Sequence, residues 1–314
     1  MEPSVNLNHF FDRPGGEPER GFDDVLEKLT AAGFRVFDYP GVIEGENWLS
    51  GTKRQREMFD KSGARVGQSH APFNRYRTYP DSEFPEIFHR AFEAAAILGS
   101  KYVVVHADEY RSIERYDEKE IVEFTYDYLA PEFEFAKKHG MKLAIENLFE
   151  DRPSDCKYFD GKSRFTSRAE EVIAIIERFN DPDVVCCYDT GHGAVSCHKA
   201  SADALKKLAK YVGCTHIHDN YLYSDAHMLP FTGKLDWPEH TRILREAGYK
   251  GDITLELVYD RMPDALVSEW MKMCYDAAER LVEMTQGGCS TGGASPSRFF
   301  RVPPVIRYSC RSRR

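Results

Sequence analysis

Residues 184–192 read VVCCYDTGH, a short apolar run that ends in an acidic residue and is followed by a histidine. A run of this length without alternating polar side chains is typical of a parallel strand that is buried on both faces. Asp189 and His192 then lie at or just beyond the carboxyl end of that strand. The stretch therefore predicts a buried parallel strand that carries two potential metal ligands at its end.

The same arrangement recurs along the chain. Short runs of apolar or β-branched residues predict eight strands, at residues 5–9, 35–39, 65–70, 102–106, 142–146, 184–189, 213–218 and 253–257. Apolar residues spaced three and four apart predict helices at residues 22–33, 52–62, 82–99, 117–139, 168–179, 199–210, 237–248 and 263–284. Ser167, with Glu170 three residues later, has the spacing of a capping box. Eight strands alternating with eight helices predict an α/β fold, a closed (β/α)8 TIM barrel.

Length and composition fit one barrel followed by a tail. The chain has 314 residues, whereas such barrels commonly have roughly 250. From residue 286 the composition changes abruptly to Gly, Ser, Pro and Arg. We therefore expect a single barrel domain at residues 1–285 and a disordered basic tail at residues 286–314.

Charge and hydropathy limit the partners. The formal net charge is −9, and the tail holds six arginines and no acid, so the rest of the chain carries −15. An acidic body disfavours binding to nucleic-acid phosphates, and no apolar stretch approaches the roughly 20 residues that span a membrane. The eight cysteines show no CxxC spacing and are expected to be reduced thiols. We expect a cytoplasmic protein with neither nucleic acid nor membrane as a partner.

Four residues at the ends of the last four expected strands form a minimal metal site. They are Glu146, Asp189, His216 and Glu256. In a (β/α)8 barrel the loops at the carboxyl ends of the strands meet on one face, so residues far apart in sequence converge there. Gathering three acids and a histidine would be costly without a compensating cation. This ligand set suits one divalent ion such as Mn²⁺, Mg²⁺ or Co²⁺, and Zn²⁺ would accept it too.

A second layer of candidate residues surrounds this set. It consists of His70, His106, His192, Asp225 and His227. Neutral imidazoles bind metals and also hold substrate hydroxyls, so these residues either complete a two- or three-zinc cluster or line a polar pocket. Five other histidines have no comparable placement and are expected on the surface or in packing: His9, His89, His139, His198 and His240. His218 is intermediate between the two classes.

Several segments, in this order, resemble a known superfamily. They are SHAPF, VVVHAD, AIEN, YDTGH, HIHDN followed by DAHMLP, GKLDW and LEL. Together they are similar to the xylose-isomerase-like TIM barrels, which include sugar-phosphate isomerases and epimerases and the endonuclease IV type of abasic-site nuclease. The resemblance covers roughly residues 5–284.

The resemblance implies roles for the candidate residues. Glu146, Asp189, His216 and Glu256 match the metal ligands of the family's ketose epimerases, in which the two glutamates also move the proton. His192 matches a histidine that contacts the substrate in those epimerases. In the nuclease branch all nine positions match ligands of a three-zinc cluster, with His70 and His106 on one ion and His192, Asp225 and His227 on the others.

The segments around the ligands favour the isomerase branch. The nuclease branch usually has a cysteine where Gly191 stands, whereas YDTGHG, and HIHDN followed by LDW, are similar to the isomerase form. Many relatives have Pro-Gly where this chain has Pro230-Phe231, a departure that concerns the substrate pocket and leaves the choice of sugar open. We expect a metal-dependent isomerase or epimerase for a sugar or sugar phosphate that works through an enediolate, with Glu146 and Glu256 as acid and base. His70, His106 and His192 would contact the substrate.

Alternatives remain open on the same barrel. They are a carbohydrate lyase or dehydratase, an endonuclease IV-like zinc phosphodiesterase for abasic DNA, and a sugar-binding module without catalysis. Relatives often assemble, so a homodimer or homotetramer is expected. Lys234, Arg75 and Arg77 are potential phosphate or hydroxyl contacts, but surface charge is the simpler interpretation for each.

Overall fold

Eight strands form one parallel sheet. The structure, a computed structural model, describes residues 1–12, 18–74, 77–107, 109, 117–149, 165–197, 202–258 and 262–288. The strands are β1 (Pro3–Asn6), β2 (Val36–Asp38), β3 (Arg65–His70), β4 (Tyr102–Val105), β5 (Lys142–Glu146), β6 (Val184–Asp189), β7 (Val212–His216) and β8 (Ile253–Leu255). All eight expected strands are confirmed, with small shifts at their ends.

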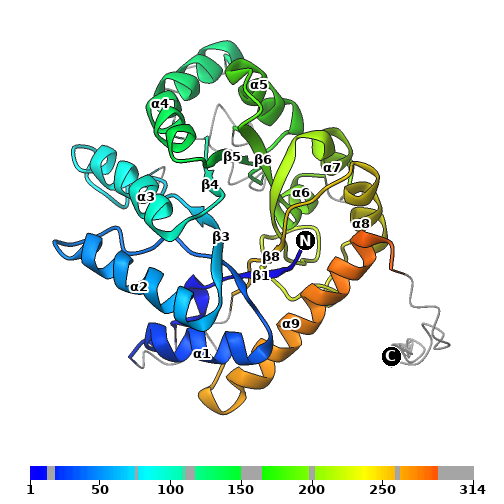
Figure 1. Ribbon diagram of the computed structural model, residues 1–314. Coiled ribbons are helices and arrows are strands. Elements are labelled where there is room, and N and C mark those ends of the chain that lie inside the picture. Colours follow the sequence, from blue (N-terminus) through cyan, green and yellow to red (C-terminus); the bar gives the residue numbers. More distant parts are fainter. Residues whose placement is uncertain are drawn as a thin grey trace, which may run out of the picture.

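The sheet curls into a nearly closed barrel. Its strand order is β7-β6-β5-β4-β3-β2-β1-β8, with β7 and β8 at the two ends. Just beyond β7, Ile217 bridges Leu255 in parallel: Ile217 donates its N–H to the Thr254 carbonyl at 2.8 Å and accepts from Glu256 N–H at 3.1 Å. Figure 1 shows the helices around this ring of strands. The expected (β/α)8 fold is confirmed.

The helices follow the expected order. They are α1 (Phe22–Ala32), α2 (Trp48–Ser62), α3 (Phe84–Leu98), α4 (Glu118–Lys138), α5 (Ala169–Phe179), α6 (Thr190–Cys197), α7 (Asp203–Leu208), α8 (Trp237–Glu246) and α9 (Asp264–Gln286), with short 3-10 turns η1 (Asn8–Phe10) and η4 (Ala209–Tyr211). The segment expected as one helix at residues 199–210 consists of α7 and η4, and its first residues lie outside the described ones.

Two local expectations need correction. The capping residue of α5 is Arg168, whose N–H donates to the Glu171 carboxylate at 3.3 Å, so the Ser167 and Glu170 assignment was wrong by one residue. Helix α6 was not predicted, because its two glycines disfavour a helix. It begins directly after β6, where the Asp189 carboxylate accepts from His192 N–H at 2.6 Å and so caps the first turn.

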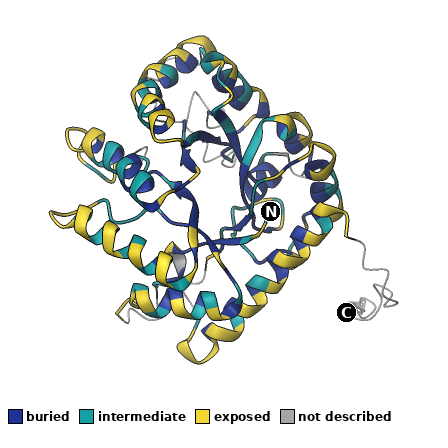
Figure 2. Ribbon diagram, in the orientation of Figure 1, coloured by how far each residue is buried: buried dark blue, intermediate teal, exposed yellow. Residues whose placement is uncertain are grey.

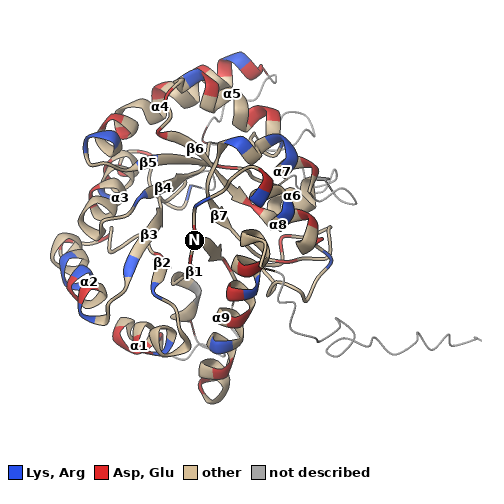
Figure 3. Cartoon of the chain, turned by 45° about the vertical axis from the view of Figure 1, so that its right-hand side comes forward, with Lys and Arg blue, Asp and Glu red and all other residues tan. Residues whose placement is uncertain are grey.

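The apolar core lies between the strands and the inward faces of the helices. Figure 2 shows this burial on the inner side of each helix, and Figure 3 shows Lys, Arg, Asp and Glu mainly on the outer faces. Inside the ring of strands, by contrast, several polar side chains are buried: Asn6, Asp38, Gln68 and Thr254. Barrel interiors are usually filled by branched aliphatic residues. The polar interior of this barrel therefore requires an explanation other than packing.

Some expectations concern the chain outside the described residues. Helix α9 ends at Gln286, next to the expected boundary at 285, and the disorder expected for residues 286–314 stays a prediction. Cys186, Cys187 and Cys214 are buried thiols without a disulfide, as expected, and Cys274 is buried too. Among the described residues, no helix has the length and hydropathy needed to cross a membrane.

Candidate functional site

The nine residues expected at strand ends lie at the carboxyl-terminal end of the barrel. Glu146, Asp189 and His216 are the last residues of β5, β6 and β7. His70 ends β3, and Glu256 follows the last residue of β8. The other four come from the segments after β4, β6 and β7: His106, His192, Asp225 and His227. Parallel strands in a closed barrel all end on the same face, which brings these residues together.

Asp225 and His227 reach the site because the segment after β7 folds back. Asp219 and Met228 form an antiparallel bridge, with N–H to carbonyl distances of 2.7 Å and 2.9 Å. The loop closed by this bridge carries Asp225 and His227 on its returning arm. The His227 carbonyl accepts from Val258 N–H at 3.3 Å, which ties the loop to the segment after β8.

Glu146 is the centre of the site. Its side chain is almost fully buried, and four imidazoles surround it. The distances from its carboxylate are 3.0 Å to His70 Nε2, 3.2 Å to His216 Nδ1, 3.3 Å to His192 Nδ1 and 3.4 Å to His106 Nε2. A buried carboxylate is costly unless it is paired or binds a cation. The arrangement therefore requires positive charge within this cluster.

Asp189 and Glu256 complete the group. Glu256 Oε2 lies 3.5 Å from His216 Nδ1. One ligand atom from each of Glu146, Asp189, His216 and Glu256 lies within 4.8 Å of the other three, and His70 forms an overlapping group with Glu146 and His216. The four residues proposed from sequence as the minimal ligand set thus meet in one small cluster.

Three of the histidines are held through Nδ1 by backbone carbonyls. The contacts join His70 to the Ala71 carbonyl at 2.7 Å, His192 to the Asn147 carbonyl at 2.9 Å and His227 to the Glu256 carbonyl at 3.2 Å. A carbonyl oxygen only accepts, so each Nδ1 must donate. In a neutral imidazole the opposite nitrogen, Nε2, is then left as a lone-pair donor to a metal.

Each of these Nε2 atoms faces a carboxylate oxygen. His70 Nε2 lies 3.0 Å from Glu146, and His192 Nε2 and His227 Nε2 lie 3.3 Å and 3.0 Å from Asp225. A lone pair and a carboxylate repel each other at such distances unless a proton or a metal ion lies between them. The donor set therefore fits a divalent cation.

In the metal-free chain, protons supply the missing charge. Burial lowers the pKa of His227, but the hydrogen bond to Asp225 and the charge of Glu256 outweigh it and raise this pKa to about 9. Burial raises the pKa of Glu256, but the charges of His216 and His227 outweigh it and lower this pKa to about 2. Burial is likewise outweighed at His192, where Asp189 and Asp225 raise the pKa well above its ordinary value.

His218 is a site residue that the sequence analysis left unassigned. It is fully buried, and its Nε2 lies 3.1 Å from Asp189 and 3.5 Å from Asp225. Its ring stacks on that of His227 at 4.1 Å, and the two form a second potential metal group with His192 and Asp225. The signal was available, because His216 and His218 are two residues apart and therefore point to the same side of a strand.

The sequence matches a known protein family over most of its length. The model of the xylose isomerase-like TIM barrel family matches residues 26–277. The chain belongs to this family. Two curated proteins are similar to it: y4fM of Sinorhizobium fredii, 26% identical over 207 residues (63% of this chain, 60% of the relative), and MJ1311 of Methanocaldococcus jannaschii, 26% identical over 239 residues (74% and 77%). The match thus spans less than two thirds of y4fM.

Solved structures of other xylose isomerase-like barrels have the same fold. A D-tagatose 3-epimerase-like protein superposes with a TM-score of 0.66 and 22% identity, covering 90% of this chain and all of the other. A D-psicose 3-epimerase gives 0.67 and 16%, covering 92% and 100%. The IolI protein with a bound zinc atom gives 0.66 and 16%, with the same coverage. At these identities the likeness establishes the fold.

Gly191 separates this barrel from the pattern usual in the nuclease branch. A Cβ atom at position 191 would lie 1.8 Å from Cε1 of His218, far inside contact distance. A cysteine there is incompatible with His218 in its present position. Gly191 and His218 are therefore a matched pair, and the absence of a side chain at 191 lets the imidazole approach the acids.

We expect Gly191→Ala to lower the free energy of unfolding by about 1–3 kcal/mol, because the buried His218 ring must move to make room. Denaturant titration of the metal-free protein measures this loss. Gly21→Ala is the matched control, since a Cβ there meets nothing within 4 Å. Equal stability of the Gly191 and Gly21 variants would contradict the close packing.

The other candidate residues lie apart from the site or outside the described residues. His89 pairs with Glu132, His139 contacts the Phe135 carbonyl, and His240 is buried against Trp237, in keeping with surface or packing roles. Arg77 and Lys234 are exposed. Arg75, His198 and the side chain of His9 lie outside the described residues. The expected homodimer or homotetramer and the cytoplasmic location stay predictions.

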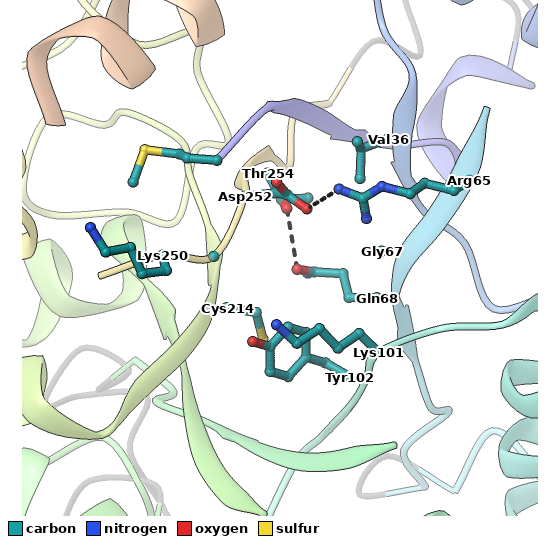
Figure 4. Close-up of a pocket in the computed structure, with 12 residues that line it drawn as sticks. Val36, Arg65, Gly67, Gln68, Lys101, Tyr102, Cys214, Lys250, Asp252 and Thr254 are labelled. Atoms are coloured by element: carbon teal, nitrogen blue, oxygen red, sulfur yellow. Dashed lines mark hydrogen bonds and ion pairs between the residues drawn. The ribbon is translucent and has the colours of Figure 1, made fainter. Parts of the chain in front are cut away.

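Two cavities mark the two ends of the barrel. One, of about 280 Å³, borders Glu256 and His70 and is also lined by Asn6, Asn8 and Phe73. The other, of about 250 Å³, opens at the amino ends of the strands beside Arg65 and Asp252 and contains none of the candidate ligands (Figure 4). The carboxyl-end cavity is therefore the one of these two that borders candidate ligands.

Proposed function

We propose that the protein is a metal-dependent isomerase or epimerase acting on a small sugar. The observation that carries the proposal is the cluster of Glu146, Asp189, His216 and Glu256, whose ligand atoms lie within 4.8 Å of one another beside the cavity that Glu256 borders. That cavity lies at the small end of the range for ligand pockets, which suits a single sugar unit. Two structural neighbours, a D-tagatose 3-epimerase-like protein and a D-psicose 3-epimerase, favour the same class by their names.

The same four residues would hold the metal. Three carboxylates and one imidazole suit Mn²⁺, Mg²⁺, Co²⁺ or Zn²⁺. When bound, the ion would supply a Lewis acid that stabilises negative charge on the substrate's carbonyl and hydroxyl oxygens. The zinc atom bound to IolI supports a divalent metal on this fold.

Glu146 and Glu256 would move the proton. They come from β5 and from the end of β8, so they approach the site from different parts of the barrel. One carboxylate would take the proton next to the carbonyl carbon, and the other would return a proton from the opposite face or to the neighbouring carbon. Glu256 borders the cavity and Glu146 is more deeply buried, so we assign the first proton transfer to Glu256. His70 and His106 would position the hydroxyls.

The second group would hold a second ion. Asp225 lies 3.0 Å, 3.3 Å and 3.5 Å from Nε2 of His227, His192 and His218. These separations are close to the roughly 3.3 Å between ligands of a tetrahedral zinc with bonds of about 2.0 Å. Four protein ligands would leave no open position, so this ion would stabilise the loop that carries Asp225 and His227.

The test combines metal content with proton exchange. We expect elemental analysis of the purified full-length chain to find one or two divalent ions per chain, and chelator dialysis to remove activity. In D2O, a panel of ketoses and aldoses followed by ¹H NMR should reveal a substrate that loses its signal from the carbon-bound proton and yields a stereoisomer or the isomeric sugar. A purified chain that binds no divalent metal, and that exchanges no proton of any sugar in the panel when Mn²⁺ or Zn²⁺ is added, would refute the proposal.

The same preparation distinguishes the alternatives. Loss of water in the product would identify a lyase or dehydratase. Three tightly held zinc ions and cleavage of an abasic-site oligonucleotide would identify the nuclease, which the pairing of Gly191 with His218 disfavours.

A further inference from the structure

A column of buried polar side chains runs through the barrel towards His216. Its members are Asn6 on β1, Asp38 on β2, Gln68 on β3 and Thr254 on β8, each at most 3% exposed. Burying polar groups costs free energy unless they are hydrogen-bonded to one another. Aliphatic side chains would fill this space at lower cost, so the column points to a function beyond packing.

Asp38 is the junction of this column. Its Oδ2 accepts from Asn6 Nδ2 at 3.2 Å and from Gln68 Nε2 at 3.2 Å, and it lies 3.0 Å from His216 Nε2. Thr254 Oγ1 donates to Gln68 Oε1 at 3.2 Å (Figure 4). This contact orients the amide so that its nitrogen faces Asp38. Three neighbours thus converge on one carboxylate oxygen.

The contact with Asp38 fixes which ring nitrogen of His216 carries the proton. A carboxylate accepts, so His216 Nε2 must donate. In the neutral ring Nδ1 then carries the lone pair, and Nδ1 is the atom that faces Glu146 at 3.2 Å and Glu256 at 3.5 Å. His216 is the one imidazole among the four minimal ligands, so its orientation decides whether the site has a nitrogen ligand.

We propose that Asp38 is a positioning residue that holds His216 as the tautomer protonated on Nε2, so that Nδ1 is presented to the metal. Gln68 and Asn6 hold the Asp38 carboxylate in place, and Thr254 orients Gln68. The negative charge of Asp38 also makes His216 a stronger electron donor. This inference rests on the metal site of the proposed function and adds a residue that touches neither metal nor substrate.

Hydrogen bonding and packing alone do not explain why residue 38 is a carboxylate. Its second oxygen, Oδ1, is buried and has no hydrogen-bond partner among the described residues. An asparagine would use the same volume without a buried charge. The cost of keeping a carboxylate there is explained if its charge acts on His216.

Asp38→Asn tests this directly, because the amide oxygen can still accept from His216 while the charge is lost. We expect the full-length variant to fold, by circular dichroism, and to bind Mn²⁺ and Zn²⁺ about 10–100-fold more weakly in competition with a chelator. Glu171→Gln is the matched control: Glu171 is a carboxylate as deeply buried, but it caps α5 and should leave metal affinity unchanged. Unchanged affinity in Asp38→Asn, or an equal loss in both variants, would overturn the proposal.

A measurement on the wild-type chain covers the case in which Asp38→Asn does not fold. In the zinc-loaded protein with ¹⁵N-labelled histidine, NMR should find His216 protonated on Nε2 and metal-bound through Nδ1. Protonation on Nδ1 would overturn the inference. If wild-type protein binds no divalent metal at all, the proposed function itself fails, which is a different result from tight binding that does not depend on Asp38.

Discussion

Glu256→Gln should slow exchange of the substrate's carbon-bound proton with solvent by about 10²–10⁴-fold, the usual contribution of a general acid or base. An amide has nearly the shape of the carboxylate but cannot take up the proton. Because Glu256 borders the cavity, the loss should appear in kcat, measured by ¹H NMR in D2O with saturating sugar.

Glu246→Gln provides the matched control. Glu246 lies on the outer surface of α8 and pairs with Arg242, so the same chemical change there should leave exchange at the wild-type rate. The corresponding change at Glu146 should also reduce exchange. Full exchange in both Glu146→Gln and Glu256→Gln, each with its metal retained, would refute the assignment of these two residues as acid and base.

Removing the metal should have the second large effect. Relative to protein held at a metal concentration about 1,000-fold above its Kd, the metal-free chain should lose about 4 kcal/mol of stability. It should also become sensitive to pH. His227 has a pKa of about 9 in the folded chain against an ordinary value of 6.5, so its contribution to stability is complete below pH 6.5 and is lost as the pH rises to 9.

At acidic pH the stability of the metal-free chain changes in the opposite direction. Glu256 has a pKa of about 2 against 4.5, so its contribution is present above pH 4.5 and is lost as the pH falls towards 2. The metal-free chain should therefore be most stable between pH 4.5 and 6.5. Metal competes with protons for the imidazoles, so metal affinity should rise over the range in which the metal-free chain weakens. Thermal melts from pH 6 to 9.5 check this, and parallel curves with and without metal would contradict it.

The fold, and the meeting of most of the candidate residues at one end of the barrel, could be predicted from the sequence for a simple reason. A buried parallel strand is a short apolar run, so its end can be located from composition, and the barrel brings all such ends to one face. Glu146 and Asp189 could be found in this way because each directly terminates an apolar run.

The roles of Asp38 and His218 were not predicted because they depend on partners that are distant in the chain. Asp38 also ends a strand, but it meets His216 178 residues later, and nothing near residue 38 indicates that meeting. His218 lies within the strand expected at residues 213–218 and on the same side as His216, but its role depends on its contact with Asp189, 29 residues earlier. Helix α6 was not predicted because the side-chain cap from Asp189 outweighs the low helix propensity of its glycines.

The closure of the barrel gives the proposed metal a mechanical role. β7 and β8 stand at the two ends of the sheet order, and in the described part of the chain one isolated backbone bridge, between Ile217 and Leu255, joins them. His216 lies on one side of this seam and Glu256 on the other. An ion that takes one ligand from each side would cross-link the end of β7 to the end of β8. The proposed metal site would then also stabilise the closed barrel at the place where its backbone pairing is weakest.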